Sequence, residues 1–361
     1  MQEKKQIKAL FCINTPAQAH TWRNVIENLI RKGHKVRILA RDYGSTAGIL
    51  TNSGFQAYTF RPIKKNYLRA FEIIPHLYNG LKVSKGFVPT IIVGFGVDAA
   101  LIAGLLRKPC IVFTDSENAP VQHFLTKYFA SVIVTPRCFA EDLGKRHLRI
   151  DGYKELAYLH PDYFEPDPSI FHELKLSENE RFIILRFNVF DAVHDIGEYG
   201  FSASDQSSLV RKLSKYARVF ISPEGPLATE LEEYRLSIPY ERIHHVLYYA
   251  QLLVTDTQTM ATEAAILGTP TIRCNSFVDS VNVGNFIELE QKYDLVYSIR
   301  NTEQAINKAT ELIQQTDAKE QWAKKRKKLL SDKIDVTQFM IDFIENYPDS
   351  YKEYKARSNK L

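Results

Sequence analysis

Short apolar runs alternate with amphipathic helical patterns along most of this chain of 361 residues. The pattern opens with apolar runs at residues 7–13 and 36–40, and a helical pattern with one apolar face separates them over residues 17–32. Runs that are apolar throughout indicate strands buried on both faces, and helices between them are the usual crossovers of parallel strands. We therefore predict an α/β protein built on parallel sheets that helices cover on both faces.

A segment rich in proline, aromatic and acidic residues interrupts this alternation at residues 151–169 and indicates a domain boundary. Predicted strands lie on both sides of it, at residues 55–60, 90–93, 110–114 and 132–135 before it and at residues 182–187, 219–222, 252–254 and 295–298 after it. We expect an N-terminal Rossmann-like domain over residues 1–160, a second one over residues 170–318, and a long C-terminal helix with a polar tail over residues 319–361. Ligands of such sheets bind beyond the carboxyl ends of the strands, so the expected site is the cleft between the two domains.

Charge and cysteine usage limit the classes of function. The formal net charge of +5 allows a phosphate-bearing partner but does not argue for a nucleic acid. The four cysteines form no Cys-x-x-Cys pair, and three of them lie in or beside apolar runs, as reduced core thiols of a cytoplasmic protein do. The first apolar run is too short for a signal peptide, so a cytoplasmic location is expected.

The stretch QLLVTDTQTMATEAAILGTPTIRCN, residues 251–275, combines a buried strand, a polar turn and a short helix. Thr255, Asp256 and Thr257 end the strand with side chains that favour helix N-caps, and Gly268 stands where a C-cap glycine belongs. A helix N-terminus that follows a strand presents unpaired amides and a positive dipole end, which suits a phosphate. The alternative is an ordinary strand–helix–strand unit with a capped helix, because neither glycine fingerprint of nucleotide-binding turns is present.

Ionisable side chains follow several predicted strands of the first domain. Asp98 and Asp115 are candidates for general acid–base catalysis, since a second carboxylate or burial can raise the pKa of one of them. Helix N-capping is the alternative for both. His20 is a candidate base in the first turn of the first helix, with a structural role as its alternative.

The second domain has its own polar loops at the strand ends. Arg186 begins a charged loop in which Asp191 is able to orient His194 as a base, unless the loop is simply solvated. A rigid turn follows the next strand, and it either presents amides to a diphosphate or redirects the chain; its sequence is Ser222-Pro223-Glu224-Gly225-Pro226.

His244 and Arg273 complete the candidates of the second domain. His244 lies just before the strand at residues 252–254, where a base or a phosphate ligand is expected. Arg273 ends a strand and is a candidate partner of a phosphate or of a neighbouring carboxylate. No spacing of histidines or aspartates suggests a metal site, so we expect a metal-independent mechanism.

Two clusters of basic residues stand apart from these loops. One is the run Lys324–Lys328, and the other comprises Arg61, Lys64, Lys65 and Arg69. Most such clusters are solvated faces, and the alternative is docking on an anionic membrane or on a lipid-phosphate acceptor.

Five runs of the sequence resemble an uncharacterised prokaryotic family known only as a domain of unknown function. They are, in chain order, NTPAQAHTWRNVIENLIRKGHKVRILARDYG, GYKELAYLHP, FNVFDAVHD, SPEGPL and HHVLYYAQLLVTDTQTMATEAAILGTPTIRCN. That family is itself similar to the GT-B superfamily, especially the non-hydrolysing UDP-N-acetylglucosamine 2-epimerases and the nucleotide-sugar glycosyltransferases. The resemblance implies a GT-B-like fold, in which two Rossmann-like domains face each other across a cleft.

The last of these runs has the most specific implications. In the superfamily, an Asp-Ser-Gly-Gly motif followed by paired glutamates holds the diphosphate and the ribose of UDP. Here Asp256 and Thr257 match the Asp-Ser of the motif, and Glu263 matches the ribose-binding glutamate. Gln258 and Thr259 replace the two glycines, which let backbone amides approach a phosphate closely, so the threonine hydroxyls are expected to help here.

The resemblance also bears on the reaction. In the epimerases an acidic residue ends the strand that corresponds to residues 110–114, and Asp115 takes roughly that place, while Asp98 lies near a second epimerase carboxylate. The catalytic histidine of the epimerases stands in a Gly-His-Arg motif, where this chain has Arg186-Phe187-Asn188 and a displaced His194. The epimerase set of acids and bases is therefore not reproduced.

The leading hypothesis is a glycosyltransferase of surface polysaccharide or glycolipid assembly that uses a nucleotide sugar, with UDP as the expected nucleotide. No cofactor is expected beside this substrate, and the acceptor is a sugar or a lipid-linked sugar. The alternatives are a UDP-N-acetylglucosamine 2-epimerase-like enzyme and a non-catalytic protein that binds sugar nucleotides. No nucleic-acid partner is expected, and docking on the inner face of a membrane through the basic clusters stays open.

Overall fold

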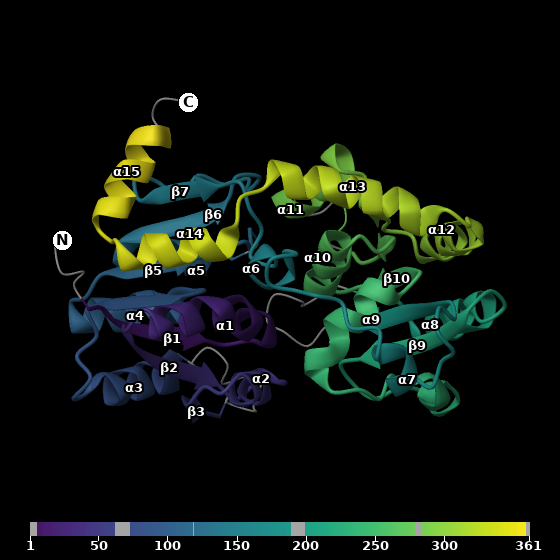
Figure 1. Cartoon of the computed structure of the whole chain (residues 1–361), viewed down its shortest axis with the longest axis horizontal. Helices are drawn as coiled ribbons and strands as arrows, with labels where there is room; N and C mark the ends of the chain where they lie inside the picture. The colour runs from purple at the N-terminus through teal and green to yellow at the C-terminus, as the bar shows by residue number, and fades with distance from the viewer. Residues whose placement is uncertain are drawn as a thin grey trace. The chain divides into compact units, whose positions relative to one another are not determined.

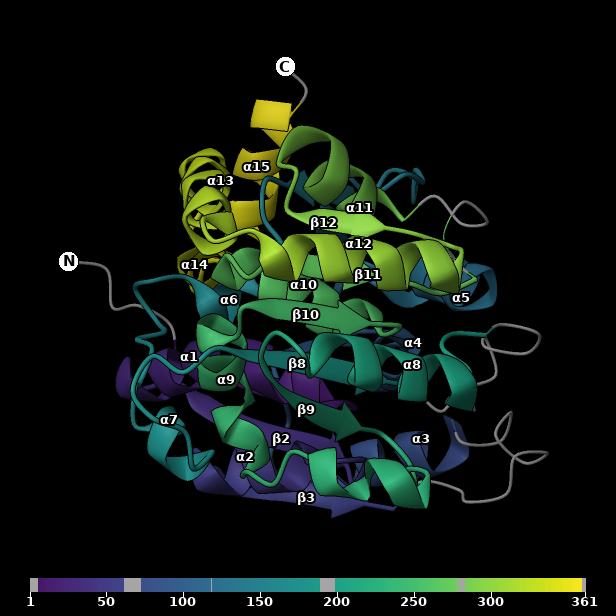
Figure 2. The same cartoon turned by 90° about the vertical axis from the view of Figure 1, so that its right-hand side faces the viewer.

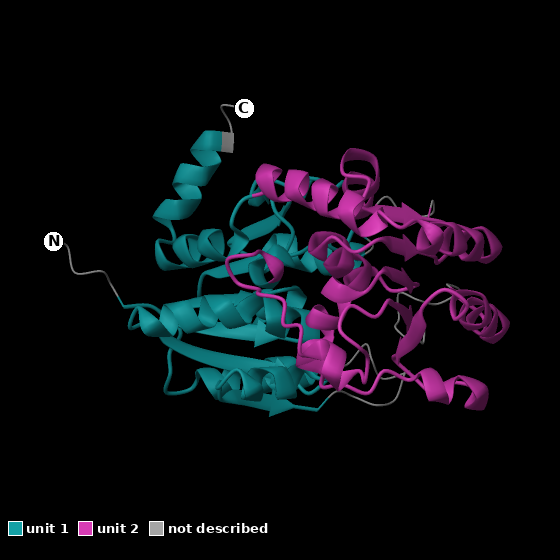
Figure 3. Cartoon of the chain, turned by 45° about the vertical axis from the view of Figure 1, so that its right-hand side comes forward, with its two compact units in different colours: residues 1–158, 334–361 teal, residues 159–333 magenta. Residues whose placement is uncertain are grey.

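The computed structural model describes residues 6–61, 73–117, 119–188, 199–276, 278 and 283–358. The chain divides into two compact units (Figure 3): unit 1 comprises residues 1–158 and 334–361, and unit 2 comprises residues 159–333. The first boundary lies within the predicted proline-rich segment, residues 151–169. The predicted third segment over residues 319–361 is divided, because its first part belongs to unit 2 and its remainder returns to unit 1.

A parallel sheet of seven described strands forms the centre of unit 1, in the order β3-β2-β1-β4-β5-β6-β7 (Figure 1). The strands are β1 (Lys8–Ile13), β2 (Lys35–Arg41), β3 (Ala57–Phe60), β4 (Ile91–Gly94), β5 (Cys110–Phe113), β6 (Val132–Pro136) and β7 (His147–Ile150). The continuous apolar runs predict the first six. They do not predict β7, because its sequence HLRI is short and half polar.

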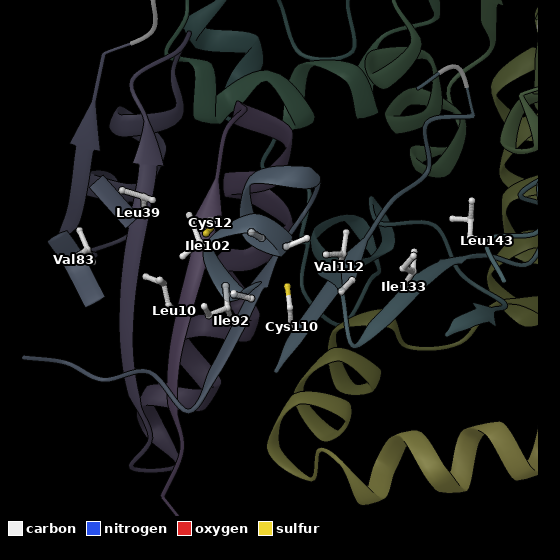
Figure 4. Packing of buried hydrophobic residues seen from close by; sticks show 14 of the residues in the cluster. Leu10, Cys12, Leu39, Val83, Ile92, Ile102, Cys110, Val112, Ile133 and Leu143 are labelled. Atoms are coloured by element: carbon white, nitrogen blue, oxygen red, sulfur yellow. The ribbon is translucent and has the colours of Figure 1, made fainter. Parts of the chain in front are cut away.

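Helices cover both faces of this sheet, and alternate residues of each strand belong to two different cores. Phe11 of β1 and Phe113 of β5 contact Trp22, with ring centroids 5.1 and 5.3 Å apart. Leu10 and Cys12 belong to a separate buried cluster that includes residues of α4 (Figure 4). The helices of unit 1 are α1 (Pro16–Arg31), α2 (Thr46–Asn52), α3 (Ile73–Ser84), α4 (Val97–Leu106), α5 (Pro120–Phe129), α6 (Leu156–Leu159), α14 (Val336–Glu345) and α15 (Asp349–Ser358).

The C-terminal residues 334–361 are part of the fold of unit 1. Helix α14 packs against α1, and the hydroxyl of Thr337 donates a hydrogen bond of 2.7 Å to the carbonyl oxygen of Ala157. The prediction of one long C-terminal helix from residue 319 onward is therefore wrong. One helix ends at Asp332, before Asp335, and the side chain of Asp335 caps the N-terminus of α14.

Unit 2 contains a second parallel sheet of five described strands, in the order β12-β11-β10-β8-β9. Its strands are β8 (Phe182–Phe187), β9 (Arg218–Pro223), β10 (Leu252–Thr255), β11 (Thr271–Arg273) and β12 (Val296–Ser298), all of them predicted from the sequence. Figure 2 looks onto the side of this sheet that α8 and α12 cover, and α9, α10 and α13 form a second group of packed helices.

The helices of unit 2 include several short turns that the sequence pattern does not predict. The α-helices are α7 (Ile170–Glu173), α8 (Ala203–Leu213), α9 (Ile243–Tyr249), α10 (Gln258–Leu267), α11 (Gly284–Ile287), α12 (Thr302–Gln314) and α13 (Ala318–Asp332). Two 3₁₀ turns and a π-helix complete the unit: η3 (Thr229–Tyr234), η4 (Tyr240–Arg242) and η5 (Glu288–Lys292). Four-residue elements such as α7 are too short to show a helical period.

Candidate functional site

The carboxyl ends of four strands of unit 2 are aligned in register, and they place polar side chains in one row. Ser222 of β9 pairs with Arg186 of β8, Arg186 pairs with Thr255 of β10, and Thr255 pairs with Arg273 of β11. Adjacent strands lie about 4.8 Å apart, so these positions form a continuous edge. The structure thus brings together Arg186, Ser222 and Arg273, which the sequence predicts separately as ligand-binding residues.

The guanidinium of Arg186 connects β8 to the turn after β9. Its Nη1 atom donates to the carbonyl oxygen and the hydroxyl of Ser222, at 3.1 and 3.2 Å, and its Nη2 atom pairs with the carboxylate of Glu224. The amide of Glu224 donates to Phe187, which fixes the turn that continues through Gly225. With 17% of its side chain exposed, Arg186 presents a positive charge at the edge of the sheet.

The carboxylate of Asp256 faces backbone amides rather than solvent. Its Oδ1 and Oδ2 atoms accept hydrogen bonds from the amides of Asn188, at 2.7 Å, and Phe201, at 3.4 Å. Burial raises the pKa of Asp256 to about 7, although these two amides act in the opposite direction. The carboxylate of Asp256 therefore holds the loops around β8 in place, and its role as a nucleotide ligand stays a prediction.

The N-terminus of α10 lies directly after this carboxylate and has no side-chain cap. Thr257 occupies the N-cap position as predicted, but its hydroxyl bonds to the hydroxyl of Thr255 at 2.8 Å instead of capping the helix. Thr257, Gln258 and Thr259 are half-buried, whereas the rest of α10 is buried. The first turn of α10 therefore offers its amides and its positive dipole end at the carboxyl edge of the sheet. Gly268 ends the helix in the left-handed conformation, as predicted.

Glu263 lies one turn further into α10 and is 6% exposed. Its Oε1 atom lies 3.0 Å from Nε2 of His244, which is also buried and comes from α9. The two side chains were predicted as separate ligands, and the structure joins them as a buried pair beneath the α10 turn. The ring of Phe164 lies edge-on to His244, with centroids 6.4 Å apart.

Arg273 is more deeply buried than its place at a strand end predicts. Its guanidinium carbon lies 3.7 Å from the centroid of the Phe286 ring, a cation–π contact, and the residue is 4% exposed. The positive charge of Arg273 therefore lies inside unit 2 and is not exposed at the row of strand ends.

In unit 1, Asp115 follows β5 and forms an ion pair with Lys154. The ammonium of Lys154 also lies 2.9 Å from Oε1 of Glu155, so one cation bridges two carboxylates. Burial opposes the charge of Lys154, but the two carboxylates raise its pKa above the usual range. Burial raises the pKa of Glu155 to about 7 against the opposing effect of Lys154.

Lys154 and Glu155 are therefore candidate site residues that the sequence analysis did not identify. They belong to the run GYKELAYLHP, which supports the family resemblance but contains no motif with a known chemistry. A near-neutral pKa suits general acid–base catalysis, and only the fold places these residues beside Asp115.

The other candidates of unit 1 have separate partners. His20 is buried and stacks on Tyr158, with ring centroids 5.4 Å apart. Asp98 is buried as well, and its Oδ2 atom lies 3.3 Å from Nδ1 of His76, on α3. The structure thus does not pair Asp98 with Asp115, and His194 lies outside the described residues.

Among the described residues, no group of three or more histidine, cysteine, aspartate or glutamate side chains is arranged to hold a metal ion. In the same part of the chain, no helix is both long and apolar enough to span a membrane.

Comparison with known proteins identifies the family and the fold. A family model described as "Protein of unknown function (DUF354)" matches residues 11–349. No curated protein matches the chain.

Among solved structures, the chain is similar to MnaA of S. aureus in complex with UDP, with a TM-score of 0.70 and 14% identity over 96% of this chain and 98% of that one. It is similar to the UDP-GlcNAc 2-epimerase of Neisseria meningitidis bound to UDP-GlcNAc, with a TM-score of 0.63 and 12% identity over 94% and 99% of the two chains. It is also similar to MurG of Acinetobacter baumannii, with a TM-score of 0.56 and 15% identity over 94% and 99%. The two α/β units thus have the architecture of the GT-B fold, as the family resemblance implies.

Proposed function

We propose that this chain, which belongs to the DUF354 family of proteins of unknown function, is a nucleotide-sugar-dependent glycosyltransferase. Unit 2 binds the diphosphate of the nucleotide sugar at the N-terminus of α10, and unit 1 supplies the groups that act on the acceptor. UDP is the expected nucleotide, because relatives of the same fold hold UDP and UDP-GlcNAc.

The observation that carries this proposal is the uncapped, half-buried first turn of α10 beside Arg186. Free amides at a helix N-terminus and a guanidinium on the neighbouring strand are a usual combination for binding phosphate groups. The hydroxyls of Thr257 and Thr259 are proposed as further donors in this turn, where Gln258 and Thr259 replace the two glycines of the superfamily motif. Glu263 is proposed as the ribose ligand, with His244 holding its carboxylate in position.

In the proposed reaction, the oxygen of an acceptor hydroxyl attacks the anomeric carbon of the sugar. The bond from that carbon to the diphosphate oxygen breaks, and its electron pair leaves with the diphosphate. The α10 amides and Arg186 stabilise the negative charge that develops there. Asp115 takes the hydroxyl proton, and Lys154 holds this carboxylate in place. We assign positioning roles to His20 and structural roles to Asp98.

The test is UDP release from UDP-GlcNAc with and without a panel of sugar and lipid-linked sugar acceptors. We expect release only with an acceptor, and we expect Asp115→Asn to stop turnover while UDP affinity stays unchanged. Release at the same rate without any acceptor would contradict the proposal.

An epimerase is the second candidate, because the TM-score with the Neisseria meningitidis UDP-GlcNAc 2-epimerase, 0.63, exceeds the TM-score with MurG, 0.56. An epimerase that removes and restores the proton at C2 of the sugar would introduce deuterium from D₂O at that position. Proton NMR of UDP-GlcNAc incubated with the protein in D₂O therefore separates the two reactions. A loss of the C2 proton signal without an acceptor would favour the epimerase.

A lipid-linked acceptor requires contact with a membrane, and one surface of unit 1 has suitable chemistry. Helices α3, α4 and α5 pack side by side, and we call their exposed apolar surface the α3–α5 face. Its apolar side chains are Ile74, Tyr78, Leu81, Leu105, Val121, Phe124 and Tyr128. The only carboxylate of these helices is the buried Asp98, whereas Lys82 and Lys127 are cationic and Arg107 and Lys108 follow α4.

Apolar side chains flanked by cations suit the surface of an anionic bilayer. The basic run Lys324–Lys328 is less suited to an anionic bilayer, because Lys324 forms an ion pair with Glu320 and Lys325 forms one with Asp294. We expect cosedimentation with vesicles that contain phosphatidylglycerol, weakened by Phe124→Ser. The control is Tyr216→Ser, an exposed tyrosine of unit 2. Equal cosedimentation of both variants would rule out the α3–α5 face.

A further inference from the structure

A cavity of unit 2 lies at the opposite edge of the sheet from the α10 N-terminus. Gln251 lines it directly before β10 and Gly268 shortly before β11, so it faces the amino ends of these strands. Its volume is about 410 Å³, within the range of roughly 300–1,000 Å³ that is usual for small-molecule sites. The four residues of β10 separate it from the carboxyl edge by about 10 Å.

Three cations of α13 line this cavity: Lys319, Arg326 and Lys327. Lys319 and Arg326 also have a structural role at helix C-termini. The Nζ atom of Lys319 donates to the carbonyl oxygen of Tyr248, at 2.6 Å, in the last turn of α9. The Nε atom of Arg326 donates to the carbonyl oxygen of Ile266, at 2.8 Å, in the last turn of α10.

These bonds use only part of the donor capacity of the two cations. A lysine ammonium has three N–H donors and an arginine guanidinium has five. Lys319 uses a second donor on the hydroxyl of Thr269, at 3.2 Å. Within the described part of the chain, both terminal nitrogens of Arg326 and one N–H of Lys319 stay available to a ligand.

Among the described residues, no carboxylate forms an ion pair with Lys319, Arg326 or Lys327. Burial and, after it, the charge of Arg326 lower the pKa of Lys319 to about 7. Glu180 is the only carboxylate that lines the cavity in the described structure, and its Oε2 atom accepts the amide of Ser177 at 3.0 Å. Two neighbouring cations that repel each other beside a cavity are stabilised when an anion binds there.

Aromatic rings form the apolar part of the cavity wall. Phe171, Tyr248 and Tyr249 line it, and the centroids of the Phe171 and Tyr249 rings lie 5.1 Å apart. Gly268 has a φ of +76°, and a Cβ atom there would lie 2.9 Å from Cδ of Arg326. The absence of a side chain at this position lets the stem of Arg326 pack closely against the end of α10.

We propose that this cavity binds a phosphate monoester that carries a flat or apolar group, with the phosphate on Arg326, Lys319 and Lys327 and the apolar group against the tyrosines. Three cationic side chains that line one cavity suit the double negative charge and the several acceptor oxygens of a phosphate monoester. This inference does not depend on the proposed transferase activity, since the cavity lies at the other edge of the sheet.

The experiment is isothermal titration calorimetry of the full chain with phenyl phosphate, and with orthophosphate and phenol as partial probes. We expect phenyl phosphate to bind at millimolar concentration or below, orthophosphate to bind more weakly, and phenol not to bind. Arg326→Gln should weaken binding at least about tenfold, and Lys327→Gln several-fold, because each removes a charge-assisted bond.

The matched control is Lys324→Gln on the same helix, which is exposed, pairs with Glu320 and does not line the cavity. If Arg326→Gln does not fold, the phenyl phosphate affinities of Lys327→Gln and Lys324→Gln test the inference instead. Lack of binding to the wild type, or equal affinity of Lys327→Gln and Lys324→Gln, would overturn the inference. Loss of phenyl phosphate binding in Gln258→Pro would also overturn it, because that result places the phosphate at the α10 N-terminus.

Discussion

The Oδ1 atom of Asp256 accepts a hydrogen bond of 2.7 Å from the amide of Asn188, and this bond joins the carboxyl ends of β10 and β8. The Oδ2 atom accepts the amide of Phe201, so one buried carboxylate holds both flanks of residues 189–200. The backbone carbonyl oxygen of Asp256 accepts a hydrogen bond of 2.8 Å from the side-chain amide of Asn275, which lies next to β11. The aspartate that opens the proposed diphosphate turn therefore organises the edge of the sheet.

This environment predicts a pH-dependent stability. The pKa of Asp256 is about 7 in the folded protein and near 4 in an unfolded chain, so the folded state binds an additional proton between these values. The free energy of unfolding therefore falls as the pH rises from about 4 to about 7, by about 1.4 kcal/mol or less per pH unit. Asp256→Asn should lack this part of the pH dependence. Urea unfolding of both proteins at pH 5, 6, 7 and 8 measures the free energy of unfolding at each pH. A stability difference between wild type and variant that does not change with pH would contradict the assignment.

A substitution at Gly94 tests the packing at the end of β4. A Cβ atom there would lie 2.8 Å from Cβ of Ala99 and 3.1 Å from the carbonyl oxygen of Cys12, so backbone would have to move. We expect Gly94→Ala to lower the free energy of unfolding by about 1–3 kcal/mol. Gly48→Ala in α2 is the control, because no heavy atom lies within 4 Å of its added Cβ. The control should be neutral or stabilising by up to about 1 kcal/mol, and equal losses in both variants would refute the packing argument.

The bridge formed by Lys154 predicts a compensating pair of variants. Lys154→Met leaves the carboxylates of Asp115 and Glu155 without their shared cation, and Glu155 is only 1% exposed. We expect a loss of about 3–5 kcal/mol of stability, since a buried charge loses its partner. Adding Glu155→Gln should recover part of this loss, because one of the two unpaired charges is then absent. Chemical denaturation of the wild type, the two single variants and the double variant gives the coupling energy, and additive effects would argue against the bridge.

The C-terminal segment should be essential to the stability of unit 1. Phe343 of α14 is fully buried and stacks on Phe339, with ring centroids 5.3 Å apart. Phe343→Ala should cost about 3–5 kcal/mol and speed amide hydrogen exchange in α1, against which α14 packs. Lys352→Ala, which removes an exposed ion pair with Asp349, should change stability by about 0.5 kcal/mol or less. If Phe343→Ala instead speeds amide hydrogen exchange in unit 2 and not in α1, the assignment of residues 334–361 to unit 1 is contradicted.

Much of the fold could be predicted from the sequence, because its signals are local. Most strands contain a short apolar run, and the amphipathic helices between them show a helical period, so two parallel sheets follow from the pattern alone. The polar strand β7 has no such signal. The break near Asp335 depends on bonds to residues 151–157, far away in the chain, such as that from Thr337 to Ala157.

The site could be predicted only in part, for the same reason. Arg186, Ser222 and the first turn of α10 end strands or begin helices, and such positions can be found from the pattern. The partners of these residues cannot, because pairs such as Glu263 with His244 and Asp115 with Lys154 join distant parts of the chain. Burial also changes roles: Asp256 and Arg273 have the residue types of ligands, yet the fold places both side chains inside.

The central claim is that the first amides of α10 bind the diphosphate of a nucleotide, and calorimetric titration with UDP tests it through Gln258. This residue is the first of the helix, where proline fits the backbone and removes only the N–H group. Thr257 before it has φ −93° and ψ 147°, which a following proline also allows. We expect Gln258→Ala, which keeps the amide, to bind UDP like the wild type, and Gln258→Pro to bind it about tenfold or more weakly. Equal affinity of the two variants, or no UDP binding by the wild type, would contradict the claim.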